Sequence, residues 1–124
     1  MSQWLAIAGG GAAGALLRYW VSNAVYTLAG RAFPYGTLAV NVLGSLAMGF
    51  LFVLLVERLE SGPAVRAFLL IGLLGAFTTF STFSIETLNL IQAGEAMKAV
   101  LNMLLSVLLC MVAVALGVLV GRQL

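Results

Sequence analysis

The ten residues GAFTTFSTFS, from Gly75 to Ser84, place five hydroxyl side chains and three phenylalanines inside an otherwise apolar run. Hydroxyl groups can replace local backbone hydrogen bonds, and the glycines Gly72 and Gly75 lower the cost of leaving helical geometry. The stretch therefore predicts a break near the middle of a membrane helix. Carbonyls exposed by a break are tolerated against protein, water or an ion, and a dehydrated Na⁺ would satisfy several at once.

The composition of the whole chain is typical of a membrane protein. Of its 124 residues, 63% are hydrophobic and 8% are charged, which is far from the balance of a soluble domain. Charged residues cluster in short gaps, and the apolar stretches between them are long enough to cross a bilayer. The sequence predicts an all-α membrane protein with one domain, 1–124, and four spans at about residues 4–25, 36–56, 67–91 and 99–120.

The chain lacks the side chains that enzymes use. It contains no histidine and a single cysteine, Cys110, and we find no carboxylate pair or cysteine cluster in it. Nucleophilic, acid/base and transition-metal chemistry all require such groups. We therefore expect no enzyme and no nucleic-acid partner. The expected surroundings are the bilayer and a second copy of the chain.

Basic residues are divided almost evenly between the two sides of the predicted bundle. Arg58, Arg66 and Arg122 fall on the side of the termini, and Arg31 and Lys98 fall on the other. This division gives almost no positive-inside signal, so the chain is expected to insert in both orientations. Oppositely inserted copies can pair about a two-fold axis in the membrane plane, which predicts an antiparallel homodimer of dual topology. The alternative is one fixed orientation.

Two polar residues lie inside the first two predicted spans. Arg18 must reach water, an anion or a polar partner, and the alternative is that it snorkels to the interface beside Tyr19 and Trp20. Asn41 could donate to a permeating anion, or it could form an interhelical hydrogen bond.

Pairs of small residues four apart predict close helix packing, within one chain or between two. These pairs are Gly10 and Gly14, Ser45 and Gly49, Gly72 and Ala76, and Gly117 and Gly121.

Beyond the predicted break, Phe80 and Phe83 are three residues apart and share a helix face, while Thr79, Thr82 and Glu86 follow an adjoining one. The edge of a phenyl ring is positive, so ring edges could coordinate an anion weakly while nearby hydroxyls donate hydrogen bonds. The alternative is a packed core with serines bonded to the preceding turn. Rings and hydroxyls at one depth favour an anion pathway.

Three motifs resemble the small bacterial fluoride channels of the Fluc family, also called CrcB. They are GAFTTFSTFS with Ile85 and Glu86, GTLAVNVLGS in the second span and GALLRYW in the first. The resemblance covers all four predicted spans. It implies an antiparallel, dual-topology homodimer in the bacterial inner membrane, with two separate pores that passively export cytoplasmic fluoride.

The resemblance also implies roles for individual residues. Phe80 and Phe83 would be the rings beside the pore ions, with Asn41 as a hydrogen-bonding neighbour. Arg18 would lie toward the aqueous entrance. The polar track along the third span would consist of Ser81, Thr82 and Glu86. The carbonyls of Gly75 and Thr78 from each subunit would hold a structural Na⁺ at the dimer centre.

The fourth span departs from the family pattern. Family members often continue the polar track there with hydroxyls, whereas this chain has Asn102, Ser106, Cys110 and Val114 at helical spacing. We expect Ser106 to belong to the anion pathway, while Cys110 and Val114 are poorer donors.

Two other classes of membrane protein are alternatives to a channel. A small multidrug exporter needs a mid-membrane acid, usually in the first span, but no acid precedes Glu57. An assembly subunit would need neither the ring pair nor Arg18.

Overall fold

The computed structural model describes residues 2–59 and 61–124, and these residues form helices and short connections with no strand. Two of the elements, η1 and η2, are π-helical: η1 follows α2 without a gap, and η2 joins α3 to α4 without a gap. The elements are α1 (Gln3–Ala29), α2 (Tyr35–Phe52), η1 (Val53–Arg58), α3 (Pro63–Arg66), η2 (Ala67–Leu73), α4 (Leu74–Phe77), α5 (Phe80–Gln92) and α6 (Ala96–Gln123).

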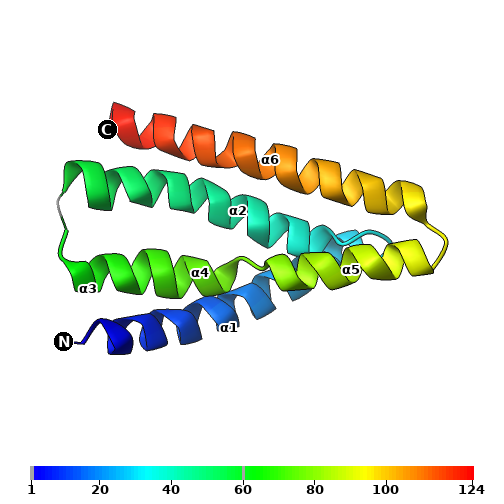
Figure 1. Ribbon diagram of the computed structural model, residues 1–124, viewed down its shortest axis with the longest axis horizontal. Helices are drawn as coiled ribbons and strands as arrows, with labels where there is room; N and C mark the ends of the chain where they lie inside the picture. The colour runs from blue at the N-terminus through cyan, green and yellow to red at the C-terminus, as the bar shows by residue number, and fades with distance from the viewer. Residues whose placement is uncertain (1, 60) are drawn as a thin grey trace.

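The helices lie side by side along one long axis, and both termini lie at the same end of the molecule (Figure 1). α6 packs along α2, and α1 packs along η2 and α4. The segment from α3 to α5 runs the full length of the bundle, and the junction of α4 with α5 lies near its middle (Figure 1).

Three helical segments, the second of them interrupted, are long and apolar enough to cross a membrane: Tyr35–Arg58, Pro63–Gln92 and Ala96–Gln123. They contain the predicted spans 36–56, 67–91 and 99–120. α1 contains the predicted span 4–25 and is 27 residues long, although it is not among these three. Large apolar side chains point outward along α6, where Leu104, Val107, Leu108 and Met111 are each more than half exposed. An outward apolar face suits a lipid or subunit environment.

Glycines let the helix backbones approach closely within one chain. A Cβ atom at Gly14 would collide with the carbonyl of Leu73 in η2, and one at Gly10 would collide with the carbonyl of Phe68. A Cβ at Gly49 of α2 would meet the carbonyl of Val114 in α6. The small-residue spacing of the sequence is therefore used for contacts between helices of the same chain.

Gly14→Ala is expected to lower the thermal stability of the purified protein. The new methyl group must push η2 away from α1, and overpacking of this kind costs about 1–3 kcal/mol. Gly11→Ala is the matched control, because nothing lies within 4 Å of a Cβ at Gly11. Equal melting temperatures of the two variants in detergent would contradict the close α1–η2 contact.

The third segment breaks at Thr78 and Thr79. Both have extended backbones, with φ −88° and ψ 158° at Thr78 and φ −151° and ψ 118° at Thr79. The break was predicted in this stretch, but the glycines are not where the helix opens. Gly72 stays helical, and a Cβ there would lie 2.7 Å from the carbonyl of Ile7 on α1. β-Branched threonines suit the extended geometry, whereas Gly72 serves helix packing.

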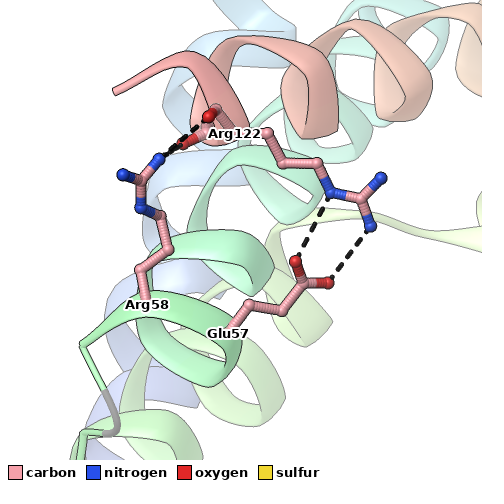
Figure 2. A network of polar contacts seen from close by, with 4 residues as sticks. Glu57, Arg58 and Arg122 are labelled. Carbon is pink, nitrogen blue, oxygen red and sulfur yellow. Dashed lines mark hydrogen bonds and ion pairs between the residues drawn. The ribbon is translucent and has the colours of Figure 1, made fainter.

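A network of charged side chains joins the end of η1 to the end of α6 (Figure 2). Nη1 of Arg58 donates to the carbonyls of Gly121 and Arg122, each at 3.0 Å. Arg122 donates to both carboxylate oxygens of Glu57, at 3.4 Å. A cation at the carboxyl end of a helix satisfies carbonyls that have no partner within the helix. Two of the basic residues used to predict topology therefore hold the bundle end together.

Candidate functional site at the helix break

Asn41 satisfies the extended backbone at the break. Its Oδ1 accepts a hydrogen bond from the Thr79 amide at 2.7 Å, and its Nδ2 donates to the Thr79 carbonyl at 3.1 Å. Both polar groups of the Thr79 backbone are therefore paired by one side chain from α2. Because an unpaired peptide group inside a membrane is costly, Asn41 explains how the helix can open at this depth.

Thr79 also starts α5. Its Oγ1 accepts a hydrogen bond from the Thr82 amide at 3.1 Å, as an N-cap residue does. The same oxygen donates to the Thr82 hydroxyl at 3.1 Å and lies 3.3 Å from the Ser81 hydroxyl. Three of the five hydroxyls between Gly75 and Ser84, those of Thr79, Ser81 and Thr82, thus lie together at the first turn of α5.

Several carbonyls at the end of α4 lack a helical partner, as expected at a helix end. The Leu74 carbonyl accepts from the amide and the hydroxyl of Thr78, both at 3.1 Å. The Thr79 amide, which would reach the Gly75 carbonyl in an unbroken helix, is taken by Asn41. Among residues 2–59 and 61–124, no hydrogen-bond donor pairs with the carbonyl of Gly75 or of Thr78.

Arg18 lies against the break from the α1 side. Its Nε donates to the carbonyl of Ala76 at 3.0 Å, and the contact is partly buried. Ala76 lies in the short helix α4, close to its carboxyl end, where a cation is favourable. The structure therefore gives Arg18 a polar partner inside the protein.

A cavity of about 460 Å³ opens beside the break. The rings of Phe80 and Phe83 lie along it with their centroids 5.3 Å apart and their planes tilted by 40°. Phe80 is 77% exposed, so its ring is largely free of contacts within the chain. The other lining residues come from α2, the break and α6: Asn41, Gly44, Ser45, Met48, Thr78, Thr79, Ser106, Val107, Cys110, Met111 and Val114.

A buried polar chain connects the α6 wall of this cavity to α5. Asn102 Nδ2 donates to Thr87 Oγ1 at 2.9 Å, and Ser106 Oγ donates to Asn102 Oδ1 at 3.4 Å. The Thr87 hydroxyl donates to the Phe83 carbonyl at 2.7 Å. Asn102 is 1% exposed, so its amide is enclosed, with one hydrogen bond at its nitrogen and one at its oxygen.

Glu86 lies in a different place. Its Oε2 accepts a hydrogen bond from the Tyr26 hydroxyl at 3.0 Å, and that hydroxyl lies 3.4 Å from Thr37 Oγ1. Glu86 lines a second cavity of about 230 Å³ together with Tyr26 and Arg31. The Arg31 guanidinium lies 4.5 Å from the centre of the Tyr26 ring. The other Glu86 oxygen, Oε1, is buried with no partner among the described residues.

The family model described as "CrcB-like protein, Camphor Resistance (CrcB)" matches residues 5–118. The chain belongs to the CrcB family. Curated relatives are similar over nearly the whole chain. A "Fluoride-specific ion channel FluC" of Magnetococcus marinus is 60% identical over 119 residues, covering 96% of this chain and 95% of the relative.

Two further relatives carry the same name. The protein of Coxiella burnetii is 56% identical, covering 90% of this chain and 91% of its own, and that of Geobacter sulfurreducens is 48% identical over the full length of both. The CrcB chain is thus a multi-pass membrane protein, and its relatives are named as channels and not as enzymes.

The site residues predicted for this CrcB chain do not all lie in one cavity. Asn41, Phe80, Phe83 and Ser106 line one cavity, whereas Glu86 lines the other. Thr82 contacts Thr79, and Ser81 is exposed on the first turn of α5. Arg18, predicted toward an entrance, contacts the break through the Ala76 carbonyl.

Sequence reasoning missed two groups of residues in the CrcB chain. Ser45, Met48 and Met111 line the larger cavity, and Tyr26 holds Glu86. Ser45 lies four residues after Asn41, so helical spacing could have found it. Tyr26 carries no comparable signal, because it lies on another helix, 60 residues from Glu86.

Proposed function

We propose that this chain is a passive, fluoride-selective channel of a bacterial inner membrane that exports cytoplasmic fluoride. Its membership of the CrcB family and the printed names of its relatives support the proposal. The single observation that carries it is the broken helix, which places the Phe80 and Phe83 rings in one cavity with Asn41 and Ser106. These groups suit an anion that has shed its water, because ring edges and N–H and O–H donors replace its hydration.

The proposed assembly is an antiparallel homodimer with two pores, in which α1 provides a fourth span. Both termini lie at the same end of the molecule, as an even number of crossings requires (Figure 1). Basic residues are divided almost evenly between the two ends, with Arg58, Arg66 and Arg122 at one end and Arg31 and Lys98 at the other. This even division fits insertion in both orientations.

Within one pore, the anion would pass along the face of α5. Phe80 and Phe83 would present their ring edges, while Asn41 would offer the amide N–H that is not engaged by the Thr79 carbonyl. Ser106 would donate from α6. The polar track of Ser81, Thr82 and Glu86 would continue the pathway along α5, with Glu86 facing the second cavity.

The proposed structural Na⁺ would bind at the centre of the dimer, on the carbonyls of Gly75 and Thr78 from each subunit. The residues fit such an ion, because both carbonyls lack a donor in the described parts of the chain and hard cations prefer oxygen ligands. Gly75 also lies at an exposed face of α4, with only the Leu70 carbonyl within 4 Å of a Cβ placed there. A partner subunit could therefore approach this face.

Replacing all Na⁺ with a large organic cation is expected to weaken the dimer or to stop fluoride flux slowly. The carbonyls would then lose the ion that offsets their mutual repulsion. Size-exclusion chromatography in detergent and liposome flux, each with sodium and with N-methylglucamine, measure the two effects. Identical dimer and flux in both salts would contradict a central Na⁺.

Arg18→Gln is expected to lower fluoride flux by a similar factor at low and at high ionic strength. Its guanidinium bonds to the Ala76 carbonyl, and a short-range contact inside protein is little affected by salt. Flux in liposomes at two salt concentrations makes the comparison. A loss seen only at low salt would instead assign Arg18 to an aqueous entrance that attracts anions.

Fluoride efflux from liposomes containing the purified protein tests the proposed function. A fluoride electrode follows the loss, chloride-loaded vesicles run in parallel, and no proton gradient is applied. Rapid loss of fluoride without loss of chloride is the expected result. Absence of flux from folded, dimeric protein would overturn the proposal and favour a non-transporting assembly subunit, whereas proton-driven export of an organic cation would identify a multidrug exporter.

A further inference from the structure

A directed chain of hydrogen bonds joins the backbone of Phe83 to the side chain of Ser106. The Thr87 hydroxyl has one proton, and it donates that proton to the Phe83 carbonyl at 2.7 Å. Thr87 Oγ1 can therefore only accept from Asn102. This fixes the Asn102 amide with its N–H₂ toward Thr87 and its Oδ1 toward Ser106.

Asn102 connects the two walls of the larger cavity without lining it. Its side chain is 1% exposed, and its bond to Thr87 is the one side-chain hydrogen bond between α5 and α6 in the described parts of the chain. Phe83 and Ser106, at the two ends of the chain of bonds, both line the cavity. An effect of Asn102 on an anion in the cavity must therefore pass through Ser106 or Phe83.

Ser106 is the strongest hydrogen-bond donor that α6 offers to the cavity. The other α6 residues there are Val107, Cys110, Met111 and Val114, of which only the Cys110 thiol has a proton to donate, and weakly. The Ser106 hydroxyl currently donates to Asn102 Oδ1 over 3.4 Å, which is long for a bond between oxygens. Giving up so weak a bond costs little.

We infer that Asn102 is a positioning residue. Its Oδ1 accepts a hydrogen bond from the Ser106 hydroxyl and so keeps that hydroxyl oriented until a dehydrated anion enters the cavity. The inference rests on the proposed function. When an anion enters the cavity, the hydroxyl turns to it, because a charge-assisted bond is shorter and stronger than the bond to Asn102. When the anion leaves, the Ser106 hydroxyl turns back and donates again to Asn102 Oδ1. The exchange keeps the anion bound weakly enough to move on, as conduction requires.

A double-mutant cycle in liposomes tests this. Ser106→Ala removes the hydroxyl, and Asn102→Leu removes its acceptor while filling a similar volume. We expect each single variant to lower the fluoride flux on the order of tenfold. If Asn102 acts through Ser106, the double variant conducts no worse than Ser106→Ala alone. Losses that multiply in the double variant, or normal flux in Asn102→Leu, would overturn the inference.

Thr87, the hydrogen-bond partner of Asn102 on α5, provides an independent test should Asn102→Leu fail to fold. Thr87→Val removes the hydroxyl that orients the amide but keeps the branched shape, and we expect it to lower flux in the same way. Thr87→Ser restores a hydroxyl and should recover the flux that Thr87→Val loses. Normal flux in Thr87→Val, or no recovery in Thr87→Ser, would count against the inference. Absence of fluoride flux in the parent protein would overturn the proposed function itself, and the inference with it.

Discussion

Isoleucine in place of Phe80 or of Phe83 is expected to abolish fluoride flux while the dimer stays intact. Both rings line the larger cavity, and isoleucine keeps an apolar side chain there but has no positive ring edge. Phe80 is 77% exposed within the chain, so its replacement leaves little unfilled volume inside the subunit. Fluoride efflux from liposomes measures the effect, and size-exclusion chromatography in detergent checks the assembly.

Phe52→Ile is the matched control for the ring substitutions. Phe52 ends α2, is 44% exposed and is not among the residues that line the larger cavity. Its replacement makes the same chemical change away from the cavity and should leave the flux unchanged. Normal flux in both Phe80→Ile and Phe83→Ile would show that the two rings only pack the protein. A dimer lost in these variants would instead assign them to the subunit interface.

Asn41→Leu is expected to lower the thermal stability more than the other substitutions proposed above, and to reduce the fluoride flux. Leucine has a similar size but leaves the amide and the carbonyl of Thr79 without their partner. Leaving a buried polar group unpaired costs about 1–3 kcal/mol. The loss of both partners would therefore remove a large fraction of the free energy of unfolding of an ordinary protein. Thermal unfolding in detergent and liposome flux measure the two losses.

Asn89→Leu is the control for the stability measurement alone, because Asn89 lines the second cavity with Glu86. Asn89 lies on α5, is exposed, and its side chain makes no hydrogen bond to the described residues. It should melt at the parent temperature. Asn41→Leu that melts with this control would show that the break at Thr78 and Thr79 holds itself open without Asn41.

Much of the architecture could be predicted because its causes are local in sequence. Apolar stretches of sufficient length predict membrane helices wherever they occur, and the observed segments contain the predicted spans within a few residues at each end. The position of the break is also a local property, since adjacent threonines both favour extended backbone and supply the hydroxyl that caps the next helix. The spacing of Phe80 and Phe83 fixed their shared face.

The candidate site could be predicted only in part, because its partners come from distant helices. Asn41 was recognised as a polar residue in a span, but its two bonds to Thr79 depend on where α2 crosses the break. Glu86 has the helical spacing of the Thr79 and Thr82 track, yet Tyr26 holds it in the second cavity. Helical spacing gives a side chain's direction without giving its neighbour.

The sequence by itself determined that this protein is a bundle of membrane helices, with one helix broken at a stretch of threonines, serines and phenylalanines. Composition and periodicity suffice for that, because burial in lipid and local backbone preference act on each segment separately. Only the tertiary structure decided which groups meet the opened backbone. Gly14 lets α1 approach Leu73, and Gly44 lets α2 approach Thr78, and these close approaches bring Arg18 to the Ala76 carbonyl and Asn41 to Thr79.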